Sequence, residues 1–545
     1  MSMKQQPLTE RFSRSAQAKL VFEGALVGLT GGAAVVLYRR VLSWAEGAMR
    51  AITSWAQSNL FFIVLWFVVL AALVFIVGKL MLYEPYTQGS GIPQTDAEAI
   101  GRLDMPWYKV MWTKFVEGTL CCFGGLSLGR EGPSVMLGGM SGKAVSKLFH
   151  KDRGIESLFV TCGAAAGMAA AFHAPLTGVL FAVEEIHKVF SASLVMTAMS
   201  SAVVSDFLVS QVLGMRPTLN FQLIVNNLPH TPNYVLVILM GIYCGFLGAL
   251  HNKGMFGCQK LYGKIHSYVP YTRIAIPFAL AGIIAFTAPD LMCGGDAIIE
   301  RLQNPYALSI GTIIFLLVGK YLFTTISFAS GAPGGTLFPL VVMGSLSGAL
   351  FCRILGFFGV SEMYMMNFIY LGIAGLFAGV VRAPVTAIVL VFELTGSLDT
   401  LLSVSIVSML AFVTANLLDV DPFYEHLLKN LLGTLPGDAE LKKLHGVSMR
   451  TYNVTLNSLA AGKAIRDIPW PNNTHVILVE RAGAKIAPQG GTVLEPTDTI
   501  TVLINRSNLA SAEQELTDLC RPQAFVTTDA VSPDSGSEGP SDKSK

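Results

Sequence analysis

The stretch Gly-Arg-Glu-Gly-Pro-Ser at residues 129–134 interrupts an apolar part of the chain with two glycines and a proline. Similar glycine-rich breaks occur at residues 89–93 and 331–339. Pro133 stands where the first turn of a helix tolerates proline. Because that turn leaves backbone N–H groups unpaired and partly positive, the breaks predict three helix N-termini able to bind an anion. For one motif alone, close helix packing through glycine explains the pattern equally well.

The composition indicates a membrane protein. Of the 545 residues, 52% are hydrophobic and only 14% are charged, whereas an average soluble domain has about 25% charged residues. Uncharged runs extend over residues 61–78, 302–319 and 401–418. A membrane-spanning helix needs roughly 20 mostly apolar residues. The sequence therefore predicts an all-α polytopic membrane protein with broken helices.

The apolar region contains an internal repeat. A glycine-rich segment, a proline and a glutamate nine residues after the proline occur twice: residues 163–167, Pro175 and Glu184, then 372–375, Pro384 and Glu393. A proline followed by glycines five and nine residues later also occurs twice: Pro133, Gly138 and Gly142, then Pro339, Gly344 and Gly348. Such repeats are typical of transporters whose broken helices meet near the bilayer midplane. We therefore expect a duplicated fold.

Charge and cysteine patterns limit the partners. The net charge of +2 gives no reason to expect nucleic acid or an acidic partner. Lys4, Arg11, Arg14 and Lys19 precede the first apolar stretch and predict a cytoplasmic N-terminus under the positive-inside rule. The eight cysteines lie mostly in apolar segments and show no metal-ligand spacing. We therefore expect them to be buried core residues, with no metal and no cofactor.

Taken in order, three motifs resemble the ClC family of chloride channels and transporters. They are Gly-Ser-Gly-Ile-Pro at 89–93, Gly-Arg-Glu-Gly-Pro at 129–133 and Gly-Ala-Ala-Ala-Gly at 163–167, the last followed by a glutamate pair. The resemblance covers about residues 20–432. It implies an inverted-repeat fold in the lipid bilayer and a homodimer with a separate anion pathway in each subunit. Some members are passive channels, and others exchange chloride for protons.

The resemblance also assigns anion-binding residues. Ser90 matches the serine whose hydroxyl coordinates the central anion, and Tyr424 matches the tyrosine that closes the inner side of the pathway. Backbone amides at Gly132, Thr336 and Leu337 match the helix N-termini at that site. Typical members have Gly-x-Phe-x-Pro, whereas residues 335–339 place the aromatic residue one position late. Amide donation does not depend on the side chain, so we expect the site to survive while pore shape and selectivity change.

Glu131 matches the external gating glutamate of the family. A carboxylate beside an anion path can occupy the anion's site when it is ionised and leave the site when it is protonated. Glu131 would then be both the gate and a proton acceptor. The plainer explanation is a glutamate that caps its helix or pairs with Arg130.

Glu184 and Glu185 follow an apolar segment, where ionisable residues are costly and suggest function. The resemblance assigns internal proton transfer to Glu185 and a structural role to Glu184, although a glutamate at a helix end near water needs no proton role. Lys114 matches a basic residue that adds positive potential along the path. The alternative is a lysine whose ammonium group snorkels to the membrane surface.

The segment after the apolar region has a soluble composition. Residues 486–498 are similar to a signature of the RCK C-terminal (TrkA-C) domain, with Thr497 where typical members have glycine. The alternation around it predicts strands at 447–456, 475–480 and 499–504, and helices at 458–467 and from Asn508. The resemblance implies a small α+β cytoplasmic domain that dimerises and binds a regulatory ligand, with cyclic di-AMP as the candidate. A generic appendage for assembly or turnover is the alternative.

The expected organisation has four segments: a cytoplasmic N-terminal segment (1–19), a ClC transmembrane domain (20–434), a TrkA-C-like regulatory domain (435–520) and a disordered tail (521–545). This architecture, without paired cystathionine-β-synthase domains, suggests a prokaryotic protein in the cell inner membrane, with both termini cytoplasmic.

The sequence favours proton-coupled chloride antiport, with a passive and possibly gated chloride channel as the alternative. A fluoride or other anion exchanger is disfavoured because the resemblance links those activities to replacement of Ser90. An enzyme would need a nucleophile–base pair or a metal cluster. None of the nine histidines has His-x-x-x-His or His-Glu-x-x-His spacing, so we expect no enzymatic activity. A potassium-linked regulator is a third possibility, but the chain has no Thr-Val-Gly-Tyr-Gly-like filter for potassium conduction.

Overall fold

The structure is a computed structural model that describes residues 14–188, 190–214, 231–304, 308–396, 400–433, 447–455, 458–481, 484–505 and 509–521. Contacts divide the chain into a helical unit, Phe12–Gly433, and a second unit that comprises Met1–Arg11 and Thr434–Lys545. Eight helices among the described residues are long and apolar enough to cross a membrane. The predicted all-α polytopic membrane fold is therefore confirmed.

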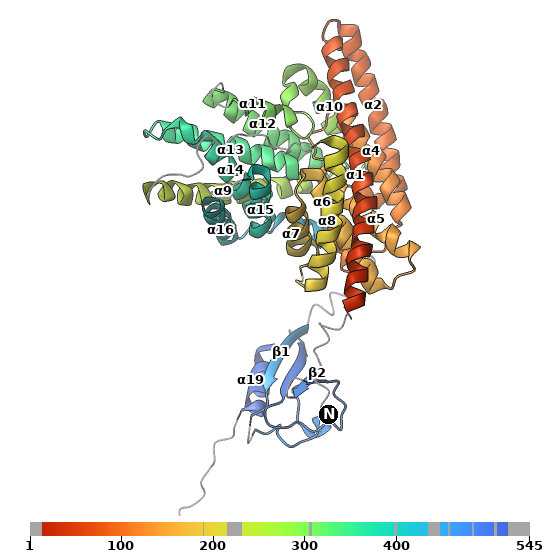
Figure 1. The fold of residues 1–545 in the computed structure, drawn as a ribbon, viewed down its shortest axis with the longest axis vertical. Helices are drawn as coiled ribbons and strands as arrows, with labels where there is room; N and C mark the ends of the chain where they lie inside the picture. The colour runs from red at the N-terminus through yellow and green to blue at the C-terminus, as the bar shows by residue number, and fades with distance from the viewer. Residues whose placement is uncertain are drawn as a thin grey trace, which may run out of the picture. The chain divides into compact units, whose positions relative to one another are not determined.

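The helical unit alternates long helices with short, broken ones (Figure 1). Its first half contains α1 (Arg14–Ala56), α2 (Leu60–Tyr83), η2 (Pro85–Thr87), α3 (Ile92–Ala99), α4 (Trp107–Phe123), α5 (Glu131–Leu148), α6 (Arg153–Phe172), α7 (Pro175–Phe181), the π-helical segment η3 (Ala182–His187) and α8 (Ala192–Leu213). Its second half contains α9 (Thr231–Gly263), α10 (Tyr271–Thr287), η4 (Pro289–Leu291), α11 (Asp296–Arg301), α12 (Ile310–Ala329), α13 (Leu337–Gly356), η6 (Glu362–Tyr364), α14 (Met365–Val381), α15 (Pro384–Thr395), α16 (Leu401–Leu417) and α17 (Phe423–Gly433).

Repeated glycines bring the backbones of paired helices into contact. A Cβ added at Gly142 of α5 would collide with the carbonyl oxygen of Phe159 in α6. A Cβ added at Gly348 of α13 would collide in the same way with the carbonyl oxygen of Phe368 in α14. Close helix approach through small residues is a common mode of packing in membranes. The repeated glycine spacing in the sequence thus corresponds to a repeated helix pair in the fold.

Glu184 and Glu393 each cap a helix in the opposite half of the repeat. The Glu393 carboxylate accepts hydrogen bonds from two backbone N–H groups at the start of α7 and from the Thr177 hydroxyl, at 2.6–2.8 Å. The Glu184 carboxylate accepts equivalent bonds at the start of α15, where Thr386 is the hydroxyl donor, at 2.7–3.3 Å. Both helices begin with proline and have no local side-chain cap. Each half therefore supplies the cap that the other half lacks.

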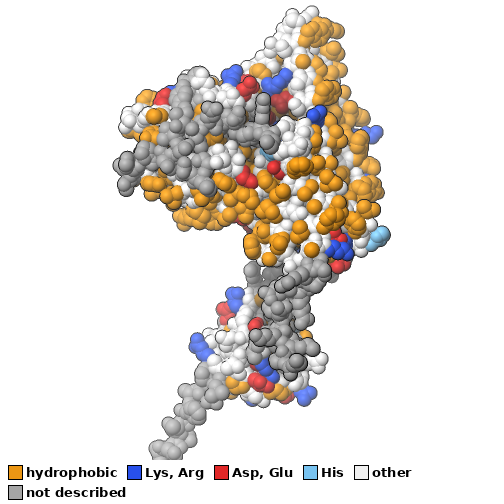
Figure 2. Space-filling view, in the orientation of Figure 1, with side chains coloured by type: hydrophobic (Ala, Val, Ile, Leu, Met, Phe, Trp, Pro, Cys, Tyr) orange, Lys and Arg blue, Asp and Glu red, His pale blue; other side chains and the backbone are white. Residues whose placement is uncertain are grey.

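Apolar side chains cover much of the helical unit's visible surface (Figure 2). On α2, Leu60, Phe61 and Phe75 are each more than 60% exposed. Large apolar surfaces of this kind are costly in water. Such surfaces are stable in contact with lipid, and the exposed apolar side chains identify α2 as a lipid-facing helix.

The second unit contains a small antiparallel sheet and a helix. Its elements are β1 (Val447–Asn453), η7 (Ile465–Asp467), β2 (Thr474–Arg481), β3 (Ala484–Ile486), β4 (Thr499–Asn505) and α19 (Leu509–Cys520). The strand order is β1-β4-β2-β3. Val479, Ile500, Val502 and Leu516 are fully buried in its core. The predicted α+β character is confirmed.

Three strands and the last helix of this unit lie close to their predicted positions, but the predicted helix at 458–467 is wrong. That segment consists of turns followed by η7. The Gly462 amide donates to the Leu494 carbonyl at 2.7 Å, and the Ile465 amide donates to the Thr492 carbonyl at 2.9 Å. These long-range partners replace the local bonds that a helix would make. Strand β3 was not predicted.

Other predictions fall on residues that the structure does not describe. These are the basic residues Lys4 and Arg11, the connection at 434–437 and the tail from residue 522. The expected start of the membrane domain at residue 20 lies inside α1, which begins at Arg14.

Candidate functional site

Backbone hydrogen bonds bring the three glycine-rich breaks together. The Gly129 amide donates to Gly335 at 2.6 Å, and the Gly335 amide donates back to Gly129 at 2.8 Å. The Gly89 amide donates to Gly331, and the Gly334 amide donates to Gly89, each at 3.0 Å. Motifs that lie more than two hundred residues apart in the chain thus form one cluster of loops at the centre of the helical unit.

Each loop leads directly into a helix, as the sequence predicts. Helix α3 follows Gly91, α5 follows Arg130 and α13 follows Thr336, and none of the three has a local side-chain cap. Gly91 has φ +96°, a left-handed conformation that suits glycine. Helix N-termini without a local cap present N–H groups and a partial positive charge. The cluster is therefore a region where a negatively charged group is stabilised by unpaired N–H groups and helix dipoles.

The carboxylate of Glu131 lies at one of these N-termini. Its Oε2 accepts a hydrogen bond from the backbone amide of Phe338 in the first turn of α13, at 3.2 Å. Its Oε1 lies 3.8 Å from Nε of Arg130 and makes no hydrogen bond to any described residue. The side chain is fully buried. Pairing with Arg130 is part of this arrangement, but the carboxylate also occupies a place where a free anion would be stabilised.

Ser90, which belongs to the first of these loops, and Tyr424 of α17 lie next to each other. Both side chains are buried, and neither hydroxyl has a well-formed hydrogen bond to another described residue. The Tyr424 phenol nevertheless lies beside the side chains of Ser90 and Thr336. Buried hydroxyls without a partner are costly. A bound anion would accept hydrogen bonds from both.

The backbone at Gly132 closes against Ser90. A Cβ at Gly132 would collide with Ser90 Oγ and would lie 2.6 Å from its carbonyl oxygen. Gly335 packs against the same backbone. A Cβ added at Gly335 would lie 2.8 Å from the amide nitrogen of Gly132. The structure thus brings the predicted backbone positions Gly132, Thr336 and Leu337 into the same small volume as the Ser90 hydroxyl.

Glu185 lies in η3, where the helix widens from α to π geometry. Such π-helical turns are rare and often occur at functional sites. The Glu185 side chain is 5% exposed, and its Oε1 has no hydrogen-bond partner among the described residues. It lies within electrostatic range of Tyr424 and of the buried Asp96 on α3. Asp96 was not predicted, because nothing in its local sequence indicates this electrostatic interaction.

Lys114 is buried and does not reach the membrane surface, so the snorkelling alternative is wrong. Its Nζ donates hydrogen bonds to the carbonyl oxygens of Thr87 and Gly89, at 2.7 and 2.6 Å. It therefore holds the loop that carries Ser90. Lys320 of α12 makes the matching contacts in the second half, where its Nζ donates to the carbonyl oxygens of Leu291 and Cys293.

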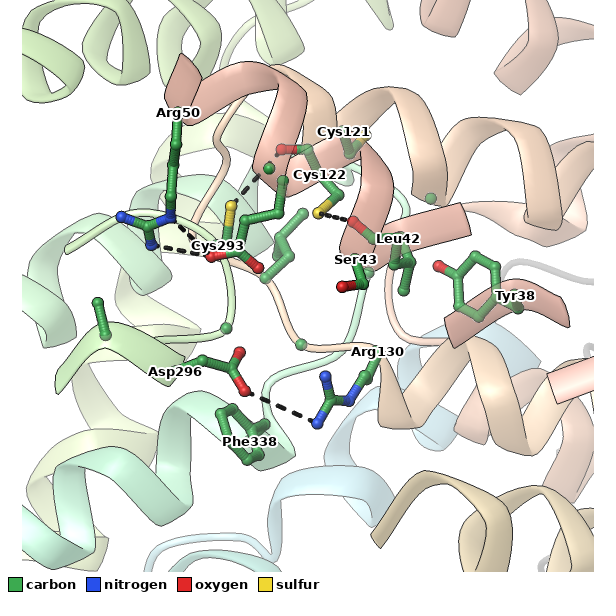
Figure 3. A pocket seen from close by; sticks show the side chains of 18 of the residues that line it. Tyr38, Leu42, Ser43, Arg50, Cys121, Cys122, Arg130, Cys293, Asp296 and Phe338 are labelled. Atoms are coloured by element: carbon green, nitrogen blue, oxygen red, sulfur yellow. Dashed lines mark hydrogen bonds and ion pairs between the residues drawn. The ribbon is translucent and has the colours of Figure 1, made fainter. Parts of the chain in front are cut away.

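A cavity of about 460 Å³ lies beside the α5 and α13 N-termini (Figure 3). Arg130 lines it together with Asp296, and the two side chains form an ion pair at 3.8 Å. The Arg130 guanidinium also lies over the Phe338 ring, 5.2 Å from its centroid. Phe338 is the aromatic residue that the sequence places one position late. Its ring thus lines the approach to Glu131.

Known protein families and individual proteins resemble this chain in sequence. The model of the family described as voltage gated chloride channel matches residues 70–416, and the TrkA-C domain model matches residues 449–517, which confirms the predicted TrkA-C resemblance. A protein of Vibrio cholerae named H(+)/Cl(-) exchange transporter ClcA is 30% identical over 426 residues, covering 76% of this chain and 90% of its own. A protein of the same name from Cronobacter sakazakii is 30% identical over 424 residues, covering 75% and 89%.

Two solved structures share the fold. A slow cyanobacterial Cl-/H+ antiporter superposes with a TM-score of 0.72 at 24% identity, covering 76% of this chain and 98% of its own. A CLC-type fluoride/proton antiporter superposes with a TM-score of 0.62 at 20% identity, covering 74% and 96%. At these identities the likeness concerns the fold alone.

Proposed function

The chain belongs to the voltage-gated chloride channel family, and from that premise we propose that it moves chloride across the cell membrane in exchange for protons. The proposed proton carriers are Glu131 on the external side and Glu185 on the internal side. The proposed anion site is formed by Ser90, Tyr424 and the backbone at Gly132, Thr336 and Leu337. Two relatives named as H(+)/Cl(-) exchange transporters support the coupled form of transport.

The observation that carries this proposal is the hydrogen bond between Glu131 and the Phe338 amide. An ionised carboxylate at the α13 N-terminus holds the position that chloride needs, because both are anions attracted by the same N–H groups. Protonation removes the negative charge and weakens that hydrogen bond, since bonds to ionised acceptors are the stronger ones. The side chain can then leave, and chloride can take its place. One group thereby couples the movement of a proton to the entry of an anion.

Glu185 supplies the proposed internal end of the proton route. Its carboxyl group is buried within electrostatic range of Asp96 and Tyr424, while Glu184 is engaged as a helix cap. Two neighbouring glutamates thus have different surroundings. The capped one is fixed by hydrogen bonds to α15, and the other retains an oxygen without a partner among the described residues. Glu185 is therefore the one free to exchange a proton.

A passive chloride channel is the second candidate, and a fluoride exchanger is the third. The passive channel would use the same anion site and would differ from the antiporter only in that chloride movement is not coupled to proton movement. The fluoride exchanger is disfavoured by Ser90, whose hydroxyl is available as a donor in the buried site. A chloride gradient that drives no proton movement in wild-type protein would select the channel.

The test uses full-length protein reconstituted in liposomes, with chloride efflux and external pH recorded together. We expect wild-type protein to move protons against their gradient when a chloride gradient is imposed. Glu131→Gln should abolish proton movement and retain chloride flux. Glu185→Gln should abolish proton movement and slow chloride flux, since it interrupts the proton route and leaves the anion site. Glu515→Gln, at an exposed position on α19 of the second unit, is the control. Unchanged coupling in Glu131→Gln would contradict the gate assignment.

We also propose that the TrkA-C domain regulates transport in a homodimer of the inner membrane, with both termini cytoplasmic. A nucleotide second messenger such as cyclic di-AMP is the proposed ligand. Regulation requires that the ligand bind two transport states with different affinity. Flux by full-length protein and by a chain ending at Leu435, each with and without cyclic di-AMP, tests this. Equal flux in all four conditions would leave the domain with an assembly role.

A further inference from the structure

Three potential metal ligands from distant parts of the chain converge in the cavity beside Arg130. They are a carboxylate oxygen of Glu46 on α1, Sγ of Cys122 on α4 and Sγ of Cys293 in the loop before α11. These ligand atoms all lie within 4.8 Å of one another, and all three residues line the cavity. Their separation in the sequence explains why the cysteine spacing gave no sign of a metal site.

We propose that Glu46, Cys122 and Cys293 form a binding site for a thiophilic divalent cation such as Zn²⁺. Two thiolates and one carboxylate form a donor set that suits zinc. In a tetrahedral zinc site the sulfur atoms lie roughly 3.8 Å apart, given Zn–S bonds of about 2.3 Å. With ligand atoms at most 4.8 Å apart, the two sulfurs need to approach by about 1 Å at most, and the carboxylate oxygen, whose bond to zinc is shorter, by slightly more. Because all three residues line the cavity, water or chloride from the cavity can complete the coordination.

The surroundings of the three ligands fit this exchange of partners. Cys122 Sγ lies 3.8 Å from the Leu42 carbonyl, and Cys293 Sγ lies 3.6 Å from the Cys122 carbonyl (Figure 3). These are weak contacts that a thiol gives up easily. The Glu46 carboxylate pairs with Arg50 at 2.8 Å, and the Arg50 side chain is 34% exposed. Arg50 can therefore swing into water when another cation takes the carboxylate.

Binding changes the charge and the protonation of the site. Zn²⁺ replaces the protons of the two thiols, which leave to solvent, so one cation enters as two protons depart. Affinity should therefore rise with pH, as it does for thiolate sites in general. No bond of the chain is broken, and no oxidant or reductant is needed.

The site lies where a metal would affect transport. Cys293 lies in the short loop that leads into Asp296, the first residue of α11, and Asp296 pairs with Arg130, the neighbour of Glu131. The same loop is held from beneath by Lys320, which donates to the Cys293 carbonyl at 2.8 Å. A metal that joins this loop to α1 and α4 would fix the walls of the cavity. We expect the bound metal to slow anion flux. This effect rests on the proposed function, whereas the binding of the metal is independent of it.

The binding test uses full-length protein freed of metal, with bound Zn²⁺ measured by equilibrium dialysis. We expect one Zn²⁺ per subunit. Cys122→Ser and Cys293→Ser should each weaken binding at least about 100-fold, the upper range found for loss of a supporting group. Cys121→Ser is the matched control, because Cys121 is buried and lines the same cavity but lies outside the ligand cluster. Arg50→Gln should tighten binding by removing the competing cation.

The flux test is separate, so failure of one proposal can be told from failure of the other. Zn²⁺ on both sides of the liposomes should slow chloride efflux by wild-type protein and by Cys121→Ser, and should leave Cys122→Ser at its own rate. Binding without inhibition would retain the metal site and reject its effect on flux. No bound Zn²⁺, equal loss in Cys121→Ser, or a disulfide between Cys122 and Cys293 in protein purified without reductant would overturn the site.

Discussion

Replacing Glu393 with alanine should destabilise the helical unit and weaken proton coupling, although Glu393 is proposed to contact neither chloride nor the transported proton. The substitution removes three hydrogen bonds from the start of α7, two of them from backbone N–H groups. Hydrogen bonds to a charged acceptor contribute about 1.5–3 kcal/mol each. Because one of the bonded amides lies at an exposed position, water can replace part of the loss. We therefore expect about 2–4 kcal/mol of destabilisation.

Thermal unfolding in detergent, followed by the fraction that remains monodisperse, measures the loss. Glu393→Gln retains an acceptor oxygen and should recover most of the stability, and Glu300→Ala on the surface of α11 should resemble wild type. Helix α7 continues into η3, which carries Glu185, so the number of protons moved per chloride should also fall in Glu393→Ala. Equal stability of Glu393→Ala and wild type would refute the reasoning, since it would mean that water satisfies the exposed amides.

Three further predictions concern other parts of the chain. Gly142→Ala should prevent correct folding, because the added Cβ collides with the backbone of α6. The control Gly257→Ala should be tolerated, because its Cβ meets nothing within 4 Å. The yield of monodisperse protein distinguishes the two variants. In the C-terminal domain, burial opposes ionisation of Asp498, but hydrogen bonds from Arg481 and a backbone amide outweigh it and lower the pKa of Asp498. The stability from this pair is therefore present above about pH 4, the unfolded value, and is lost as pH falls through the lower folded value; hydrogen exchange in β2 and β4 of full-length protein should show this loss in wild type and a flatter pH profile in Asp498→Asn. Ser90→Pro should raise nitrate flux relative to chloride flux in liposomes, because chloride is the more strongly hydrated anion and loses more when the hydroxyl donor is removed.

The sequence was informative wherever a local pattern has a direct structural meaning. Glycine and proline at 129–134 and 331–339 predicted the starts of α5 and α13, and the spacing of Gly142 and Gly348 predicted a repeated packing. The predicted clustering of Ser90 with Tyr424 depended on the family resemblance, because the two residues are more than three hundred positions apart. Their physical proximity could not be derived from composition or periodicity.

The sequence contained no indication of interactions in which distant segments supply each other's hydrogen-bond, electrostatic or ligand partners. The reciprocal roles of Glu184 and Glu393, the electrostatic interaction between Asp96 and Glu185, and the cluster around Cys293 all require the folded chain. The predicted helix at 458–467 failed for the same reason. Its backbone donors bond to residues 492–494, and a local pattern cannot register that competition.

The reciprocal caps also constrain how the protein can cycle between states. A transporter that rocks one half against the other must separate contacts between its halves, and here those contacts include four backbone amides held by Glu184 and Glu393. Two of these amides are exposed and two are partly buried. Because a hydrogen bond to a charged acceptor contributes about 1.5–3 kcal/mol, each separation would still be costly. The two halves are thus fastened into one frame. In the proposed transport cycle, opening and closing of the pathway is then left to small parts of that frame, above all to the rotation of the proposed gate, Glu131.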